Sequence, residues 1–310
     1  MEAHRALGTT LLFLGELGDA KAHLEQGIGL YDPQQHRSLA FLYGQDPKVT
    51  CLCYTAWILW LLGYPDQALA RSQEGITLAQ QLTHPFSVAF ALNWTAIVHR
   101  FRREEQETRQ RAEAVIALSR EHGFAQRLAT GTILQGWALA QQRSKLTQGS
   151  EGGEEPIVQM SQGLAAFRAT GAEVGGPQYL TLLAETLGKK GEAEAALHVI
   201  AEALAARRKS GERWWEAELY RLKGELLLAC TAEPHAEAEV CFQQALDIAR
   251  RQQAKSLELR AARSLSRLWQ HQGKRQEARQ LLAEVYGWFT EGFDTADLQE
   301  ARALLDELSL

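Results

Sequence analysis

The residues in this chain that could most readily do chemistry are acidic pairs and tryptophans, and one stretch contains both. Residues 211–230 read GERWWEAELYRLKGELLLAC, with Trp214 and Trp215 followed by Glu216 and Glu218. Two carboxylates that share a proton could form a catalytic dyad, and two indole rings could clamp a ligand. On a helix, however, side chains one or two positions apart do not face each other. The acids therefore predict solvated helix faces and favourable first-turn charges rather than a catalytic pair.

Histidine and cysteine show no spacing that suits a metal ion. The chain has 9 histidines and 4 cysteines, and none forms a CxxC pair or an i, i+4 histidine pair. Cys51 and Cys53 diverge if they lie on a helix. There is also no GxxxxGK[ST] motif and no GxGxxG motif after a strand. We therefore expect no metal, no cofactor and no catalytic residues, and predict that the protein is not an enzyme.

Charge and hydropathy exclude two classes of partner. The net charge is −5, which gives no basic footprint for nucleic acid or for an anionic membrane surface. The most apolar run is CLCYTAWILWLL (51–62), which is shorter than the roughly 20 residues that a membrane span needs. Few cysteines in a chain of this length indicate reduced thiols. We predict a cytoplasmic location, with no nucleic-acid partner and no membrane partner.

The elements that position these residues are helices in a repeated arrangement. Ala, Leu, Glu, Gln and Arg are abundant, and no stretch alternates as a strand would. One spacing recurs along the chain. A small residue is followed after seven positions by a glycine, that glycine after five positions by an alanine, and that alanine after seven positions by another small residue. Small residues at the crossing point let two antiparallel helices approach closely, while a large residue between them interlocks. The copies are Gly8, Gly15, Ala20 and Gly27; Ala56, Gly63, Ala68 and Gly75; Ala184, Gly191, Ala196 and Ala203; and Ser266, Gly273, Ala278 and Val285. A further copy has Gly224, Ala238 and Ala245, with two extra residues in its turn. The large position between the small residues is filled by Leu24, Ile200, Phe242 and Leu282.

This pattern resembles the tetratricopeptide repeat (TPR), since Leu7, Gly8 and Leu11 on the first helix and Ala20 and Leu24 on the second lie where that motif needs them. The resemblance implies an all-α, right-handed α-solenoid of about seven TPR-like helix pairs. We expect one domain over residues 1–310, with a capping helix at about 294–308. A stretch rich in Gly, Ser, Glu and Gln predicts a mobile loop at about 143–155.

A narrower resemblance concerns the amino-acid sequences of five stretches. They are SLAFLYGQDP (38–47), WLLGYPDQALA (60–70), GERWWEAELYRLKGELLL (211–228), FQQALDIARRQQAKSLELRAA (242–262) and GWFTEGFDTADLQEARALLDEL (287–308). These look like the C-terminal repeat region of bacterial signalling proteins in which a class III adenylate or guanylate cyclase domain and a AAA/STAND ATPase precede TPRs. The resemblance implies a protein- or peptide-binding scaffold that serves as the sensor or regulatory module of such a protein. An alternative is a domain that senses a small-molecule inducer, as in STAND-type regulators.

The TPR resemblance also implies that the first helix of each pair lines an inner groove. Its register gives an aromatic zone and a charged zone as partner-binding candidates. Arg260, Arg263 and Arg267 recur at i, i+3 and i+7, so they could bind a carboxylate or an acidic peptide, or could form a solvated face balanced by Glu258 and neighbouring acids. The aromatic zone could be a peptide groove or close helix packing. The candidates are Trp57, Trp60, Asn93, Arg100 and Trp137 in the aromatic zone, and Glu218, Arg221, Glu225, Arg260, Arg263 and Arg267 in the charged zone.

No matching polar cap precedes Leu7, Leu11, Leu12 and Leu14. An open end of a solenoid exposes apolar area. We therefore also expect self-association through the N-terminal end.

Overall fold

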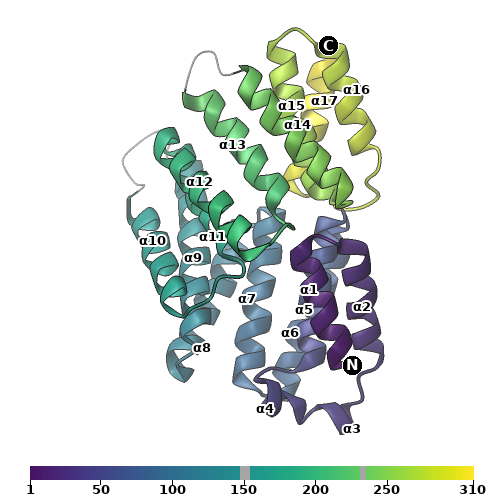
Figure 1. Ribbon diagram of the computed structural model, residues 1–310, viewed down its shortest axis with the longest axis vertical. Helices are drawn as coiled ribbons and strands as arrows, with labels where there is room; N and C mark the ends of the chain where they lie inside the picture. The colour runs from purple at the N-terminus through teal and green to yellow at the C-terminus, as the bar shows by residue number, and fades with distance from the viewer. Residues whose placement is uncertain (147–153, 231–234) are drawn as a thin grey trace. The chain divides into compact units, whose positions relative to one another are not determined.

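The computed structural model describes residues 1–146, 154–230 and 235–310, and every regular element within these ranges is a helix. The predicted all-α architecture of seven helix pairs followed by a C-terminal helix is confirmed for these residues (Figure 1). The chain divides into two compact units, which are described separately. The first comprises residues 1–60 and 67–174, and the second comprises residues 61–66 and 175–310.

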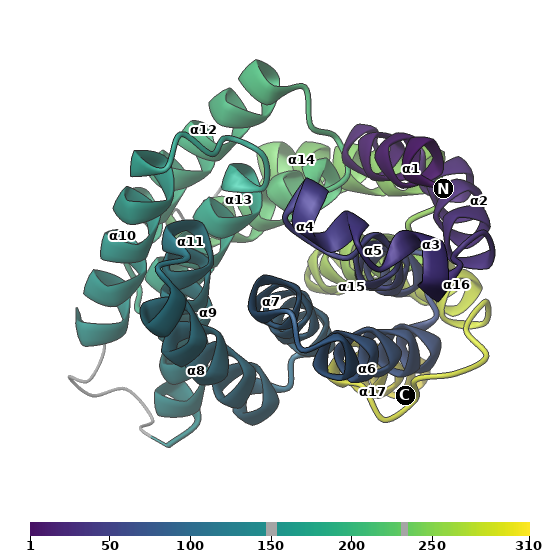
Figure 2. The same cartoon turned by 90° about the horizontal axis from the view of Figure 1, so that it is seen from below.

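The first unit contains four helix pairs, and two short helices join the first pair to the second. Neighbouring helices run antiparallel and pack in chain order, as α7 to α10 do in Figures 1 and 2. The pairs are α1 (Glu2–Leu14) with α2 (Leu17–Gly29), α5 (Pro47–Leu61) with α6 (Pro65–Leu82), α7 (Pro85–Arg102) with α8 (Glu105–His122), and α9 (Ala125–Leu146) with α10 (Glu154–Ala169); the short helices are α3 (Pro33–His36) and α4 (Leu39–Tyr43).

The second unit contains three helix pairs and the C-terminal helix. Each helix contacts the next one along the chain, and α15 also contacts α13 and α17. The pairs are α11 (Gly176–Lys189) with α12 (Ala193–Ser210), α13 (Glu216–Cys230) with α14 (His235–Arg251), and α15 (Lys255–His271) with α16 (Arg275–Tyr286); the last helix is α17 (Ala296–Ser309).

The repeated spacing has the structural cause that the sequence indicated. The turn glycines Gly15, Gly63, Gly191 and Gly273 all have φ between 79° and 92°, a conformation that favours glycine. A Cβ atom on Gly8 would lie 2.7 Å from Cγ of Leu24, which is the large residue on the partner helix. In the sixth pair, a Cβ atom on Gly224 would lie 2.5 Å from the Phe242 ring. Glycine is therefore what allows these helices to interlock.

Two predicted boundaries can be compared with the structure. Helix α9 continues to Leu146 and α10 begins at Glu154, so both ends of the loop expected at 143–155 are helical. Good helix formers such as Gln, Arg and Lys extend α9 beyond the predicted end. The rest of that loop, residues 147–153, lies outside the described residues. The capping helix expected at 294–308 is α17, which begins after Thr295 and buries Leu298, Leu304 and Leu308 in the core of the second unit.

The tryptophan pair of residues 214–215 is structural. Trp214 and Trp215 are buried, and the Trp214 indole donates a hydrogen bond of 3.2 Å to the Glu212 carboxylate. The same carboxylate accepts a 3.1 Å hydrogen bond from the backbone N–H of Gly175. Burial raises the pKa of Glu212, and these hydrogen bonds oppose the rise only in part. Glu212 thereby ties the turn before α11 to the turn before α13.

Candidate functional site

Buried polar side chains are distributed unevenly between the two helices of each pair. Among the described residues, the only polar side chains buried on the second helices are the small hydroxyl groups of Ser72, Thr108 and Ser119. Every buried amide, imidazole, guanidinium or carboxylate group that lies on a helix pair is on its first helix. These residues are Asn93, His99, Arg100 and Arg102 on α7; Arg127 and Gln141 on α9; Gln178 on α11; Glu218 and Arg221 on α13; and Glu258 and Arg260 on α15.

Each buried polar group needs a hydrogen-bond or ion-pair partner, a requirement that apolar helix packing does not have. A buried polar group costs about 1–3 kcal/mol when it has no partner, so a core that serves only stability is apolar. The second helices follow that rule and the first helices do not. The first helices therefore hold the larger buried polar groups of the helix pairs, and the candidate residues lie on these helices.

In the first unit, aromatic rings from α5 and α7 form what we call the tryptophan cluster. Trp57 packs edge-on against Trp94 with ring centroids 4.3 Å apart, and Trp60 stacks on Phe101 at 4.4 Å. Trp57 and Trp60 are 1% and 2% exposed, so both predicted tryptophans lie within the packing between these helices. The members of the tryptophan cluster are Tyr54, Trp57, Trp60, Phe90, Trp94 and Phe101.

The polar candidates of the first unit lie beside this cluster. Asn93 is fully buried, and its Oδ1 accepts a 2.6 Å hydrogen bond from the Thr130 hydroxyl on α9. Its Nδ2 has no hydrogen-bond partner among the described residues. Arg100 places its guanidinium 4.6 Å from the centroid of the Phe101 ring, within cation–π distance. Trp137 is also buried, on α9.

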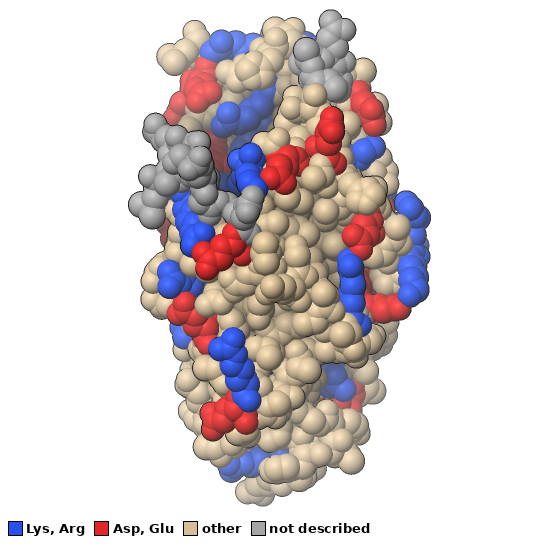
Figure 3. Space-filling view, turned by 90° about the vertical axis from the view of Figure 1, so that its left-hand side faces the viewer, with Lys and Arg blue, Asp and Glu red and all other residues tan. Residues whose placement is uncertain are grey.

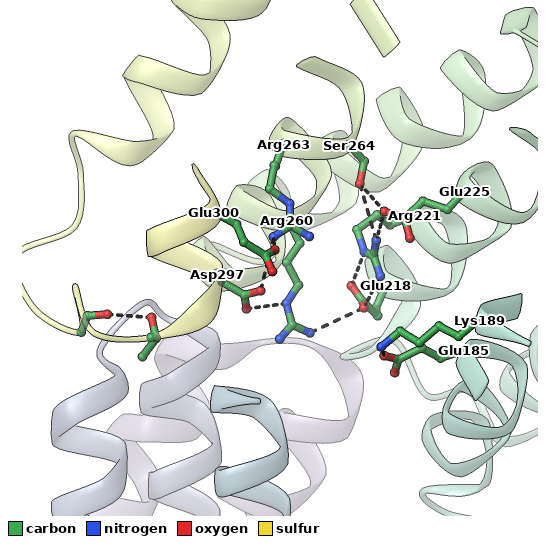
Figure 4. Close-up of polar contacts among 12 residues, drawn as sticks. Glu185, Lys189, Glu218, Arg221, Glu225, Arg260, Arg263, Ser264, Asp297 and Glu300 are labelled. Carbon is green, nitrogen blue, oxygen red and sulfur yellow. Dashed lines mark hydrogen bonds and ion pairs between the residues drawn. The ribbon is translucent and has the colours of Figure 1, made fainter. Parts of the chain in front are cut away.

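In the second unit, the charged candidates are joined in what we call the arginine network (Figure 4). Arg221 donates to both carboxylate oxygens of Glu218, at 2.8 and 2.7 Å, and pairs with Glu225 at 2.5 Å. The Ser264 hydroxyl on α15 donates to Glu225 at 2.8 Å. Arg221 and Glu218 are buried, so their charges stabilise each other in a low-dielectric environment. Glu218, Arg221 and Glu225 therefore form one ionic group on α13.

The arginine stripe of α15 meets a matching pair of acids on α17. Arg260 donates to Asp297 at 2.7 Å and lies 3.5 Å from Glu218, which joins α13, α15 and α17 (Figure 4). Arg263 pairs with Glu300 and lies 3.7 Å from Asp297. Arg267 is exposed, one further turn along the helix. The structure thus pairs two of the three predicted arginines with acids of the same chain.

The alternative interpretation named Glu258 among the acids that balance this stripe. Glu258 pairs with Arg250 at 2.9 Å and with Lys255 at 2.6 Å. Glu258 lies in the first turn of α15 and contacts the end of α14, whereas Arg263 and Arg267 are one and two turns further along. Asp297 and Glu300 share the i, i+3 spacing of Arg260 and Arg263, and that match was the available sequence signal for this pairing.

The network fixes the ionisation of its acids. Burial alone would raise the pKa of Glu218, but the guanidinium groups of Arg221 and Arg260 outweigh burial and hold that pKa below its usual range. Glu225 behaves in the same way, with Arg221 and Arg263 as the nearby charges. Both acids are therefore carboxylates at neutral pH, and each has a positive partner.

Some classes of site have no counterpart in the described parts of the chain. No group of three or more His, Cys, Asp or Glu residues there could hold a metal ion. None of the described helices has the length and apolar character to cross a bilayer. On the face shown in Figure 3, basic and acidic side chains are interspersed rather than gathered by sign.

No protein-family model matches the chain. An uncharacterised protein of Rhizobium meliloti (strain 1021) is 29% identical over 257 residues, which is 82% of this chain and 24% of that protein. The chain thus spans about a quarter of the length of this relative.

Solved structures share the fold at low sequence identity. A Rap protein complexed with competence and sporulation factor has a TM-score of 0.61 at 16% identity, covering 99% of this chain and 79% of that one. The Rap conjugation gene regulator of plasmid pLS20, in complex with the Phr* peptide, has a TM-score of 0.62 at 10% identity, covering 97% and 72%. Aspartyl phosphate phosphatase F from Bacillus subtilis has a TM-score of 0.57 at 12% identity, covering 95% and 70%. These likenesses show a TPR-like helical repeat fold.

Proposed function

We propose that this chain is a non-catalytic scaffold that binds a peptide or a partner protein on the face formed by its first helices. The observation that carries the proposal is the segregation of buried amide, guanidinium and carboxylate groups to those helices. The Rap regulator of pLS20 has the same fold and was solved with a peptide, which supports this kind of ligand. Polar groups that are already ordered lose little entropy on binding, and this favours specific recognition.

Asn93 is fully buried, so it would meet a peptide backbone only when binding moves the side chains that cover it. Its side-chain orientation is fixed because Oδ1 accepts the hydrogen bond from Thr130. Its Nδ2 is then a donor held in place, and a peptide carbonyl is the acceptor that such a donor fits. Satisfying this buried donor would recover the cost of leaving it unpaired, which is about 1–3 kcal/mol.

The arginine network would supply charge selectivity in the second unit. Mutual pairing orders the three charged residues on α13, which are Glu218, Arg221 and Glu225. Arg267 on α15 is exposed and supplies a further positive charge. An acidic group on a partner could pair with Arg267 without breaking an existing ion pair. Arg260 and Arg263 would exchange Asp297 and Glu300 for the partner only at the cost of those contacts.

We place the chain within a signalling protein as its sensor or regulatory module. The resemblance to the repeat region of bacterial cyclase and STAND ATPase proteins supports this context, and so does a longer relative of which the matched residues make up 24%. Occupation of the first-helix face would alter how successive pairs pack, and that change would pass to an output domain. Four free cysteines agree with a reducing, cytoplasmic setting.

Catalysis is the less supported alternative, although one structural neighbour is a phosphatase by name. The buried acids of the arginine network are each matched by an arginine, which suits binding more than proton transfer. Self-association is a further part of the proposal. Leu7 and Leu14 on α1 are 44% and 42% exposed, and a single monomer peak in light scattering at tens of micromolar would argue against it.

A selection from a random peptide library tests the binding function. Peptides that bind the wild-type chain would be measured by fluorescence anisotropy against Asn93→Ala and against Gln80→Ala, an amide removed from the exposed surface of second helix α6. We expect Asn93→Ala to weaken binding about tenfold or more, the equivalent of one lost hydrogen bond, and Gln80→Ala to leave it unchanged. A selection that yields no binder, or binders indifferent to Asn93, would count against the proposal.

A further inference from the structure

A pocket in the first unit lies apart from the residues that the sequence singled out. It has a volume of about 630 Å³, within the range of small-ligand sites. Its lining residues come from three connections: the end of α4, the turn into α7, and the turn from α8 into α9. Its walls include Tyr43, His84, Phe86, His122, Phe124 and Arg127.

The apolar wall of the pocket is aromatic. Phe86 meets Phe124 edge-on with ring centroids 5.0 Å apart, and His122 stacks on Phe124 at 5.5 Å. Next to the pocket residue Tyr43, α4 leaves Phe41 and Leu42 82% and 71% exposed. The Phe41 ring meets the ring of the pocket residue His84 edge-on, with ring centroids 5.5 Å apart. This wall fits a planar, apolar group.

The polar wall of the pocket is positive. Arg127 is buried, and its guanidinium lies 5.3 Å from the Phe90 ring and 5.5 Å from the Trp94 ring. None of the described residues that line the pocket is acidic. A carboxylate that reaches Arg127 could form a charge-assisted hydrogen bond beside these aromatic rings.

The helix termini add to this positive potential. Phe86 lies in the first turn of α7 and Arg127 in the first turn of α9, so the N-terminal ends of an 18-residue and a 22-residue helix meet at the pocket. The aligned peptide dipoles favour an anion at such ends. His84 Nδ1 accepts a 3.3 Å hydrogen bond from the backbone N–H of Ser87 and lies 3.0 Å from the Ser87 hydroxyl, which holds the imidazole ring at the pocket.

From these features we infer that the pocket binds an aromatic or large apolar group that carries a carboxylate. Two sources have this chemistry: the C-terminal residue of a peptide, and a free aromatic carboxylic acid. The inference goes beyond the proposed function, because it would stand even if no peptide bound the first-helix face.

Isothermal titration with four probes tests the inference on the full chain. N-acetyl-L-phenylalanine carries both features, its amide lacks the carboxylate, N-acetyl-L-alanine lacks the ring, and the peptide Gly-Gly-Gly-Gly-Phe presents a chain terminus. We expect the first probe to bind with a Kd on the order of 1 mM or below, and the amide and the alanine derivative to bind at least tenfold more weakly. A peptide that binds tenfold more tightly than the first probe would identify a chain terminus as the ligand, and equal affinity a free acid.

Substitutions locate the binding. Arg127→Gln should abolish the preference for acid over amide, while Arg120→Gln, on the exposed end of α8 outside the pocket, should leave it intact. Phe124→Ala should weaken all ring-bearing probes. If Arg127→Gln does not fold, the comparison of acid with amide on the wild-type chain decides alone. Equal binding of acid and amide, or binding indifferent to Phe124, would overturn the inference.

Discussion

The salt bridge between Arg260 and Asp297 should determine how firmly α17 closes the second unit. Arg260 is 6% exposed and Asp297 is 9% exposed, and the pair is 2.7 Å apart. Arg260→Met would keep most of the side-chain volume but leave Asp297 and Glu218 without this partner. Removing one member of a buried ion pair costs about 3–5 kcal/mol, because the remaining charge is desolvated and uncompensated.

The local free energy can be read from hydrogen exchange of α17. A loss of about 3–5 kcal/mol corresponds to exchange that is roughly 100- to 3,000-fold faster in residues 296–309, since each 1.4 kcal/mol is a factor of ten. Arg267→Met is the matched control, because it removes the same group from an exposed position on the same helix. We expect less than a threefold effect from the control.

The effect should also depend on pH with a definite sign. The pKa of Glu218 is lowered in the folded chain, so its contribution to stability is present above the unfolded pKa and is lost as pH falls through the folded value. Arg260→Met removes part of that contribution, and the difference between variant and wild type should therefore shrink below about pH 4. If Arg260→Met and Arg267→Met accelerate exchange equally at pH 7, the Arg260 contacts do not hold α17.

Three further outcomes follow from the packing and the buried groups. Gly224→Ala should lower the urea midpoint of unfolding, because its Cβ would lie 2.5 Å from the buried Phe242 ring. Overpacking costs about 1–3 kcal/mol, whereas replacing glycine by alanine in a helix gains about 1 kcal/mol. Gly29→Ala is the control and should not lower the midpoint, because the space around Gly29 is open. Glu212→Ala should lower the free energy of unfolding by about 2 kcal/mol, because it removes the hydrogen bonds to Gly175 and Trp214. Because the pKa of Glu212 is raised in the folded chain, this group makes the wild type more stable as pH falls. Glu212→Gln should lack that gain when stability is measured over a pH series. Among the four thiols, the partly exposed Cys230 should react first with a disulfide reagent at pH 8. Burial raises the pKa of the Cys51 thiol to about 12 and also raises the pKa of Cys53. Equal reaction rates for all four thiols in the native protein would refute this prediction.

Much of the fold was predictable because it depends on local spacing. The interval of seven between a small residue and a turn glycine reports one helix face and its end, and both are properties of a single segment. The contact of Gly8 with Leu24 and that of Gly224 with Phe242 follow from the same pattern. The short helices α3 and α4 escaped prediction because four or five residues are too few to show a period.

The candidate site was less predictable because its partners are distant in sequence. Helical register placed Arg260 and Arg263 on one face but could not show that Asp297 and Glu300, 37 residues away, would meet them. It also could not distinguish a tryptophan that lines a groove from one that packs against the next helix, as Trp57 does against Trp94. The pocket beside Arg127 draws on three separate connections, so no single motif marks it.

Hydrogen exchange with a selected peptide bound tests the recognition face most directly. Binding on the first helices should slow exchange in α7, α9, α11, α13 or α15 and in the turns that precede them, and should leave α6, α8, α12 and α14 unchanged. Asn93→Ala should remove the slowing in α7 and α9, while Gln80→Ala should preserve it. Slowing confined to the second helices would contradict the assignment of the polar first-helix face as the binding surface.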